Sequence, residues 1–332
     1  MNILVTGGLG FIGSHTVVEL LSSGHTITVV DSLINTTPAV QNAIEKIADT
    51  QIRFEELDVR DTESLAILME EQCIESVIHF AALKAVGESV EKPLEYYRNN
   101  IDGLLSVLEA MRAADVKQLI FSSSATVYGD PDTLPITEDS PLKPVTNPYG
   151  ATKQMAEQII ADTCQATDIR AVLLRYFNPI GAHSSGLIGE LPIGPPNNLV
   201  PYVAQAASGV RESLTIFGDD WDTPDGSGVR DYIHVVDLAK AHVASLNYLH
   251  ESTEKTSYFN IGTGHGVSVL ELIHTFEEVN EVKVPYTIGP RRPGDIASCY
   301  ASADKAAQIL GWKAELSLEQ ALKDTWNWQQ NQ

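Results

Sequence analysis

Tyr149 and Lys153 are the two residues of this sequence whose types and spacing most directly suggest acid–base chemistry. Residues four apart in a helix lie on one face, so the phenol and the ammonium would be neighbours. Lowering the pKa of a tyrosine from about 10 to about 7 requires about 4 kcal/mol of phenolate stabilisation, part of which an adjacent lysine supplies. The same spacing occurs in ordinary amphipathic helices, so the pair indicates a base only if the rest of the chain builds a site around it.

A helix that begins just before Tyr149 would position the pair. Pro148 suits the first helical position and Asn147 the cap before it. The positive end of the helix dipole would then lie near the phenol. The apolar pattern of this helix continues to Cys164, and a strand is predicted at 170–175.

The N-terminal segment has the order strand, glycine turn, helix. Residues 2–6 are apolar, Gly7, Gly10 and Gly13 follow, and a helical pattern then runs through Leu21. The first glycine permits a tight turn, the second lets backbone N–H groups approach a pyrophosphate, and the third allows close packing of helix and strand. This order predicts a dinucleotide-binding turn.

A carboxylate follows the second predicted strand. This strand covers 26–30 and ends on Asp31, 18 residues after Gly13. A carboxylate at this position can hold the hydroxyls of the adenosine ribose and would repel a 2′-phosphate. The sequence therefore favours NAD over NADP.

The following segments alternate between helix and strand. Helices are predicted at 39–49, 62–72 and 93–114, and strands at 52–57, 76–80 and 118–122. This alternation predicts an α/β fold with a parallel sheet, in which ligand-facing residues follow the strands. Asp58, Val59, Phe80, Lys84 and Ser124 stand at or just after such strand ends. Lys84 could instead be a solvated loop lysine, and Ser124 could belong to a run of turn-forming serines.

Composition restricts the partners of the chain. The 332 residues include 22 Lys and Arg against 44 Asp and Glu, a formal net charge of −22. Because this charge repels phosphate backbones and anionic bilayers, we expect no nucleic-acid or membrane partner. The N-terminus lacks the features of a signal peptide. The three cysteines are far apart and the histidines lack metal-ligand spacing, so we expect a reduced cytoplasmic protein without a bound metal.

Long motifs make the chain similar to the UDP-glucose 4-epimerases, a group within the extended short-chain dehydrogenase/reductase family. The resemblance runs from Met1 to Trp328 and rests on the runs Thr6–Gly8, Phe80–Val90, Lys92–Tyr97, Phe121–Gly129, Leu174–Pro179, Pro196–Leu199, Gly228–His234 and Pro290–Arg292, besides the Tyr149 and Lys153 pair. Such runs are far more specific than the spacing of single residues.

The resemblance implies a role for each residue that matches a family motif. Catalytic roles fall to Tyr149, Lys153 and Ser124. NAD contacts are implied at Gly7, Gly10, Phe11, Ile12, Asp31, Asp58, Val59, Phe80, Lys84, Asn99, Tyr149, Lys153 and Phe177. Substrate contacts are implied at Ser124, Asn178, Asn198, Arg230, Arg292, Asp295 and Cys299. The two arginines would supply the local cations that an acidic chain needs to hold a diphosphate.

The family also implies the architecture and the reaction. We expect a seven-stranded, mostly parallel sheet of the Rossmann type and a smaller C-terminal lobe that binds a UDP-sugar. The NAD-binding domain would comprise residues 1–176 together with segments near 230–261, and the lobe residues 177–332. The implied activity is the interconversion of UDP-glucose and UDP-galactose through a 4-keto intermediate.

Two other functions are alternatives to this activity. A nucleotide-sugar 4,6-dehydratase needs an Asp-Glu pair directly after the serine or threonine of the site, where this chain has Ala125 and Thr126. A non-catalytic NAD-binding regulator or structural subunit could keep the glycine turn and Asp31. It would have no reason to keep Ser124, Tyr149 and Lys153 as well.

The sequence departs from the family pattern at one position of the substrate site, and the family also implies an oligomeric state. Many close relatives have a tyrosine four residues after the aspartate of the Arg-Arg-x-Gly-Asp run, where this chain has Cys299, with a tyrosine only at Tyr300. The smaller side chain predicts room for an N-acetyl group, unless Cys299 is a buried hydrophobe whose lost volume is refilled by Tyr300. The family further implies a homodimer through the helix near 94–114 and the one that begins at Tyr149. The apolar residues Ile101, Leu104, Leu108, Ile159 and Ile160 are expected to contribute, although an ordinary core face also explains much of this pattern.

Overall fold

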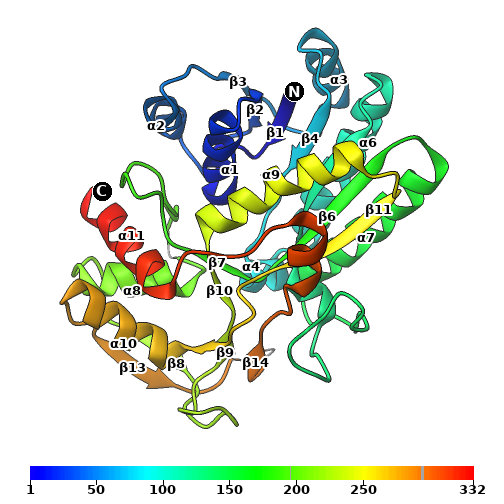
Figure 1. The fold of residues 1–332 in the computed structure, drawn as a ribbon. Coiled ribbons are helices and arrows are strands. Elements are labelled where there is room, and N and C mark those ends of the chain that lie inside the picture. Colours follow the sequence, from blue (N-terminus) through cyan, green and yellow to red (C-terminus); the bar gives the residue numbers. More distant parts are fainter. Residues whose placement is uncertain (195, 293–294) are drawn as a thin grey trace.

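The computed structural model describes residues 1–194, 196–292 and 295–332 and consists of a helix-covered sheet with a smaller lobe beside it (Figure 1). The sheet has seven strands in the order β11, β6, β5, β4, β1, β2, β3, and every neighbouring pair is parallel. The strands are β1 Asn2–Thr6, β2 Thr26–Asp31, β3 Arg53–Glu56, β4 Ser76–His79, β5 Gln118–Ser124, β6 Arg170–Tyr176 and β11 Thr256–Ile261. The α/β fold predicted from the alternation of elements is confirmed.

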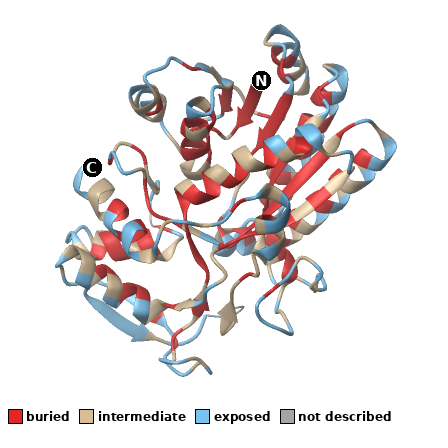
Figure 2. Ribbon diagram, in the orientation of Figure 1, coloured by how far each residue is buried: buried red, intermediate tan, exposed pale blue. Residues whose placement is uncertain are grey.

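The inner strands such as β1 and β6 are mainly apolar because helices cover both faces of the sheet, whereas the edge strand β3 carries charged residues. Successive side chains of a strand point to opposite faces, so Ile3 and Val5 join one core cluster while Leu4 joins the other. Buried residues accordingly follow the strands and the inner sides of the helices (Figure 2).

Three helices contribute to each face. The first core cluster includes residues of α1 Phe11–Ser22, α2 Ala39–Ala48 and α9 Val235–Glu251, and the second includes residues of α3 Thr62–Glu71, α6 Gly103–Ala113 and α7 Pro148–Ala166. Asp61 caps α3 by accepting a hydrogen bond from the Ser64 amide. Asn147 caps α7 in the same way from Gly150, so α7 begins where the sequence predicted.

The smaller lobe has a separate core. It contains the helices α8 Leu199–Ala207, α10 Val269–Asn280 and α11 Leu318–Gln330, and the paired strands β7 Asn178–Ile180 with β10 Tyr232–His234, β8 Leu214–Phe217 with β13 Tyr286–Gly289, and β9 Val229–Arg230 with β12 Val267–Ser268 and β14 Ser298–Cys299. Phe276 and Leu322 lie at the centre of its core. α10 begins at a complete capping box, in which Ser268 and Glu271 exchange hydrogen bonds.

Several details differ from the sequence-based expectation. The segment expected to be one helix at 93–114 divides into α5 Pro93–Tyr97, the π-helix η1 Arg98–Asp102 and α6, and the short helix α4 Val86–Glu91 precedes it. β5 extends to Ser124, beyond the predicted end at 122, and a 3₁₀ turn, η2 Ala125–Tyr128, follows. A second π-helix, η3 Ala306–Leu310, ends at Gly311.

Three of the apolar residues expected at the dimer contact lie in the core instead, in agreement with the alternative of an ordinary core face. Leu104, Leu108 and Ile160 are buried in the second core cluster of their own subunit. They face the sheet because the helical repeat places them on the same side as the other core residues.

In the part of the chain that the structure describes, no helix is long and apolar enough to span a membrane.

Candidate active site

The glycine turn after β1 forms a narrow cradle at the N-terminus of α1. Gly7 has a φ of 68°, and a Cβ atom there would lie 2.7 Å from the Ala81 nitrogen. A Cβ atom on Gly13 would overlap the carbonyl oxygen of Gly7. Gly10 caps α1 without a side chain, so the first amides of the helix are not covered by a capping group. Such a helix end suits a pyrophosphate.

Asp31 lies at the carboxyl end of β2 beside this turn. Its side chain is buried and accepts hydrogen bonds from the amides of Leu9 at 3.1 Å and Leu33 at 3.0 Å. Burial raises the pKa of Asp31, and the backbone hydrogen bonds partly oppose this effect. The carboxylate therefore fastens the glycine turn to β2, a role that the sequence did not reveal, in addition to the ribose contact expected of it.

Asp58 and Val59 follow β3. Asp58 forms an ion pair with Arg60, whose guanidinium lowers the pKa of the carboxyl group. Val59 is buried in the second core cluster. Both positions have contacts within the protein, and their contact with a cofactor stays a prediction.

Phe80 and Lys84 follow β4. The amide of Phe80 donates to Thr6 on β1, and its ring packs against His242 with centroids 4.9 Å apart. The Lys84 ammonium lies 6.0 Å from the centre of the Phe11 ring, at the start of α1. The structure thus brings Lys84 to the glycine turn. Ile12, the next residue of α1, packs on the first core cluster.

Asn100, which sequence reasoning missed, holds the loop that carries Lys84. Its side chain accepts from the Leu83 amide at 2.8 Å and donates to the Leu83 carbonyl and to Thr152. The predicted contact residue Asn99 donates to the Asn100 side chain. The available signal was a pair of asparagines inside a helical pattern, where asparagine is unfavourable.

Ser124, Tyr149 and Lys153 meet at the carboxyl end of β5. Burial raises the pKa of the Tyr149 phenol, and the nearby Ser124 hydroxyl opposes this shift. The Lys153 ammonium lies 5.9 Å from the centre of the Tyr149 ring. The Ser124 hydroxyl also accepts a hydrogen bond from the Thr126 amide. The sequence-predicted base and its two neighbours therefore form one group.

Lys153 is buried, and this burial lowers the pKa of its ammonium group toward neutral pH. Burial lowers the pKa of Lys153 to about 8, while Glu157 raises it. The ammonium donates to the Ser122 carbonyl and lies 4.8 Å from the centre of the Phe121 ring. Because its pKa exceeds 7, the ammonium form predominates at neutral pH.

A second group of predicted residues lies where the lobe meets β6. Phe177 and Cys299 belong to one small apolar cluster. β14 pairs with β9 in parallel, which places Cys299 opposite Arg230. Burial raises the pKa of the Cys299 thiol to about 11, although Arg230 opposes the shift. The Arg230 guanidinium donates to the carbonyls of Val229 and Ala297.

Asp231, next to Arg230, was also missed. Its buried carboxylate accepts hydrogen bonds from the amides of Thr263, Gly264 and Ala301. Burial raises the pKa of Asp231, and these donors oppose the shift. Through these hydrogen bonds Asp231 holds the segments that contain Thr263 and Ala301 beside β9. In this way it positions the neighbouring Arg230.

The remaining predicted substrate residues lie on loops and edges of the lobe. Arg292 pairs with Asp295 at 3.0 Å and stacks on Phe217, with its guanidinium carbon 4.7 Å from the ring centre. Asn178 is exposed at the start of β7, and Asn198 precedes α8, where its side chain makes no capping hydrogen bond. The Asn198 amide donates to the carboxylate of Glu190, a further residue that sequence reasoning missed.

Comparisons with known proteins agree with this geometry. A sequence model of the family described as GDP-mannose 4,6 dehydratase matches residues 4–325. The chain is 55% identical over 330 residues to a UDP-glucose 4-epimerase of Bacillus subtilis, covering 99% of this chain and 97% of that protein.

Two solved structures have the same fold. A UDP-glucose-4-epimerase from Stenotrophomonas maltophila, with bound NAD and formylated UDP-arabinopyranose, has a TM-score of 0.98 and 50% identity, covering 100% of this chain and 98% of the other. A UDP-glucose 4-epimerase from Bifidobacterium longum, in complex with NAD⁺ and UDP, has a TM-score of 0.96 and 52% identity, with the same coverage.

Proposed function

This chain belongs to the UDP-glucose 4-epimerases of the extended short-chain dehydrogenase/reductase family, and we infer that it interconverts UDP-glucose and UDP-galactose with NAD as its cofactor. The observation that carries this inference is the group of Ser124, Tyr149 and Lys153 at the same carboxyl edge of the sheet as the glycine turn. That group can move a proton at a sugar hydroxyl next to a bound dinucleotide.

The residues of the cradle fit NAD. The uncapped N-terminus of α1 and the glycines of the turn leave backbone amides and space for a pyrophosphate. Asp31 stands where a carboxylate holds the adenosine ribose, and Lys84 lies at the start of α1. When bound, NAD supplies the reversible oxidation of the sugar carbon C4.

Tyr149 acts as the base. Its phenolate takes the proton of the 4-hydroxyl and later returns it on the other face of the 4-keto sugar. Because burial alone raises the pKa of Tyr149, the neighbouring positive charge of Lys153 and the Ser124 hydrogen bond are needed to favour the phenolate. Ser124 orients the 4-hydroxyl for the transfer.

Arg230 and Arg292 hold the diphosphate of the substrate. The 4-keto sugar must rotate within the pocket so that its other face meets the cofactor. The protein therefore has to bind the nucleotide end tightly and the hexose weakly. Binding energy placed on the non-reacting diphosphate meets both requirements. Asn178, Asn198 and Asp295 complete the substrate side.

The dehydratase name of the matching family model does not extend to the chemistry of this site. Elimination of water from the sugar needs an acid and a base directly after the serine of the site. Ala125 and Thr126 occupy these positions, in the turn η2, and neither side chain titrates. Epimerisation needs only the groups that are present.

N-acetylated sugars form a second class of substrate. Cys299 packs with Phe177, whereas the neighbouring Tyr300 ring lies against Gly266. Tyr300 follows the last residue of β14, and because its ring lies against Gly266 we infer that it does not refill the volume beside Cys299. This supports activity on UDP-N-acetylglucosamine and UDP-N-acetylgalactosamine.

The assembly is a homodimer in the cytoplasm. Leu94, Leu105 and Met155 support the dimer, since their side chains are 81%, 41% and 47% exposed on α5, α6 and α7. The division of the chain into residues 1–176 with 230–261 and a lobe formed by the rest of 177–332 is proposed on the same family resemblance, and the separate core of the lobe supports it.

The decisive assay measures turnover of UDP-galactose by the purified protein without added NAD. A cofactor that is reduced and reoxidised within one turnover never has to leave, so we expect activity and release of NAD on denaturation. Strict dependence on added NAD, with no nucleotide in the purified protein, would contradict cofactor retention. Retained NAD without turnover of any UDP-hexose would instead favour a regulator or structural subunit.

A further inference from the structure

Glu190 links a residue of the cofactor side to a residue of the substrate side. One oxygen of its carboxylate, Oε1, accepts from the Lys84 ammonium at 2.9 Å and from the Asn198 amide at 2.7 Å. The Glu190 side chain is only 15% exposed, against 47% for Lys84. A carboxylate so shielded interacts with its partners more strongly than an exposed one.

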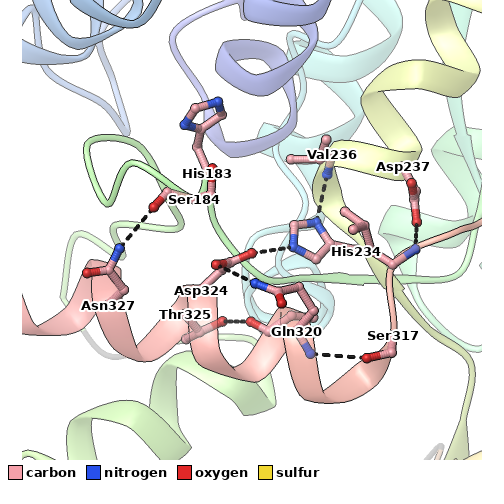
Figure 3. A network of polar contacts seen from close by, with 12 residues as sticks. His183, Ser184, His234, Val236, Asp237, Ser317, Gln320, Asp324, Thr325 and Asn327 are labelled. Carbon is pink, nitrogen blue, oxygen red and sulfur yellow. Dashed lines mark hydrogen bonds and ion pairs between the residues drawn. The ribbon is translucent and has the colours of Figure 1, made fainter.

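The loop that carries Glu190 is fastened to the last helix of the chain. The Trp328 indole N–H of α11 donates to the Glu190 carbonyl at 3.2 Å. Asn327 donates to the Ser184 carbonyl at 3.1 Å, as Figure 3 shows. A Cβ atom on Gly189 would lie 2.6 Å from the Trp328 ring, so loop and indole are in close contact.

On another side, this loop borders a cavity of about 240 Å³. Glu190, Leu191 and Pro192 line it together with α8 residues and Trp328. Loops that lack close packing on one side are held mainly by their specific contacts. The hydrogen bonds from α11 hold the backbone of the loop at Ser184 and Glu190. The position of the Glu190 carboxylate therefore depends on them.

The middle of α11 is itself held by hydrogen bonds of Asp324. Figure 3 shows Asp324, one turn before Trp328, between His234 and Gln320. His234 also accepts a hydrogen bond from the Val236 amide at the start of α9. The helix that anchors the loop is thus tied to the helix that covers the sheet.

We propose that Glu190 is a positioning residue for the epimerase reaction, which aligns Lys84 and Asn198 with each other and is itself held in place by Trp328. This inference rests on the proposed function, because Lys84 is there assigned to the cofactor and Asn198 to the substrate. Trp328, on the C-terminal helix, acts on turnover only through Glu190.

A double-mutant cycle tests the proposal. Glu190→Ala is expected to lower kcat/KM for UDP-galactose about 10- to 100-fold, since it removes hydrogen bonds to a charged group. Trp328→Phe removes only the N–H donor and is expected to lower it about 3- to 10-fold. In the Glu190→Ala background, Trp328→Phe should cost less than about twofold, because the backbone carbonyl that Trp328 holds is still present but no longer carries the carboxylate that contacts Lys84 and Asn198.

Trp326→Phe is the matched control. Trp326 lies on the same helix with similar exposure, but its ring packs on Phe276 in the lobe core, 5.7 Å between centroids. This variant should retain the parent kcat/KM. Glu190→Gln, which keeps an acceptor at the same position, should recover part of the loss seen in Glu190→Ala.

The outcomes separate the proposal from the function on which it rests. An equal loss from Trp328→Phe in both backgrounds would show a merely structural role and overturn the coupling, as would a Glu190→Ala enzyme within twofold of the parent. If Trp328→Phe does not fold, the cycle of Glu190→Ala with Lys84→Met decides, and additive losses overturn the proposal. A parent protein without turnover contradicts the proposed function. In that case, the release of NAD on heating is compared between the parent, Glu190→Ala, Trp328→Phe and the double variant.

Discussion

Among the individual residues, Tyr149 is the base of the proposed reaction, and its neighbours influence its charge. The phenol is half-buried, and the desolvation raises its pKa, while the nearby Ser124 hydroxyl opposes the shift. The Lys153 ammonium, 5.9 Å from the ring centre, is expected to stabilise the phenolate. Since the pKa of Lys153 is itself lowered to about 8, the positive charge beside the phenol is lost as the pH rises above that value.

Tyr149→Phe should therefore lower kcat about 10²- to 10⁴-fold, the usual effect of losing a general acid–base group. UDP binding, measured by calorimetry, should stay within a few-fold of the parent because the proposed diphosphate contacts are Arg230 and Arg292. Near-normal turnover of Tyr149→Phe would exclude this residue as the base.

Cys299 makes a prediction about specificity. The parent should epimerise UDP-N-acetylgalactosamine, and Cys299→Tyr should abolish this activity while largely sparing UDP-galactose. The added phenol would occupy the space beside Phe177 that the small thiol leaves. A parent inert on the N-acetyl substrate, or a Cys299→Tyr enzyme that still accepts it, would show that this position does not determine specificity.

At the scale of elements, the glycine turn depends on the close approach of β1 and α1. Gly13→Ala would place a methyl group against the carbonyl oxygen of Gly7, so the helix must shift and the pyrophosphate cradle opens. We expect purified Gly13→Ala to contain less than about a tenth of the NAD found in the parent, equivalent to a loss of more than about 1.4 kcal/mol.

Gly87→Ala provides the control for this experiment. A Cβ atom on Gly87 meets no atom within 4 Å, and its φ is not positive. This variant should keep the parent NAD content, measured by absorbance after denaturation. Full NAD content in Gly13→Ala would mean that the turn does not form the cofactor site.

For the molecule as a whole, buried histidines predict sensitivity to mild acid. Burial lowers the pKa of His15 and His79 to about 3 and that of His242 to about 4. As the pH falls below about 6.5, the unfolded chain binds these protons and the folded chain does not. The free energy of unfolding should therefore fall with a slope that approaches about 4 kcal/mol per pH unit, or about 1.4 for each histidine.

Denaturant titrations between pH 7 and 5.5 measure this slope. His242→Gln should reduce it by about 1.4 kcal/mol per pH unit. His250→Gln, which changes an exposed histidine of the same helix α9, should leave it unaltered. An unchanged slope in His242→Gln would contradict the assignment of His242 as a buried neutral group.

The proposed homodimer is tested by light scattering at micromolar concentration. The parent should have the mass of two chains, and Leu105→Glu with Met155→Glu should give monomers, because charges at an apolar contact oppose association. Ile309→Glu, at a comparably exposed apolar position in η3, should remain dimeric. A monomeric parent would exclude the dimer.

The sequence by itself determined the features that depend on neighbours along the chain. The glycine spacing fixed the turn before α1, and Asn147 and Pro148 fixed the start of α7, which places Tyr149 and Lys153 on one face. These features follow from backbone dihedral angles and local hydrogen bonds, which a short stretch of sequence determines.

Only the tertiary structure decided the contacts between distant residues. Lys84 and Glu190 are 106 residues apart, and nothing local to either predicts their ion pair. Cys299 lies opposite Arg230 because β14 and β9 adopt one register, and Leu105 is exposed while Leu104 is buried because the packing of α6 selects one face. Such contacts depend on the path of the whole chain, since the free energy of burying one face or one register arises only when the partner element is in place.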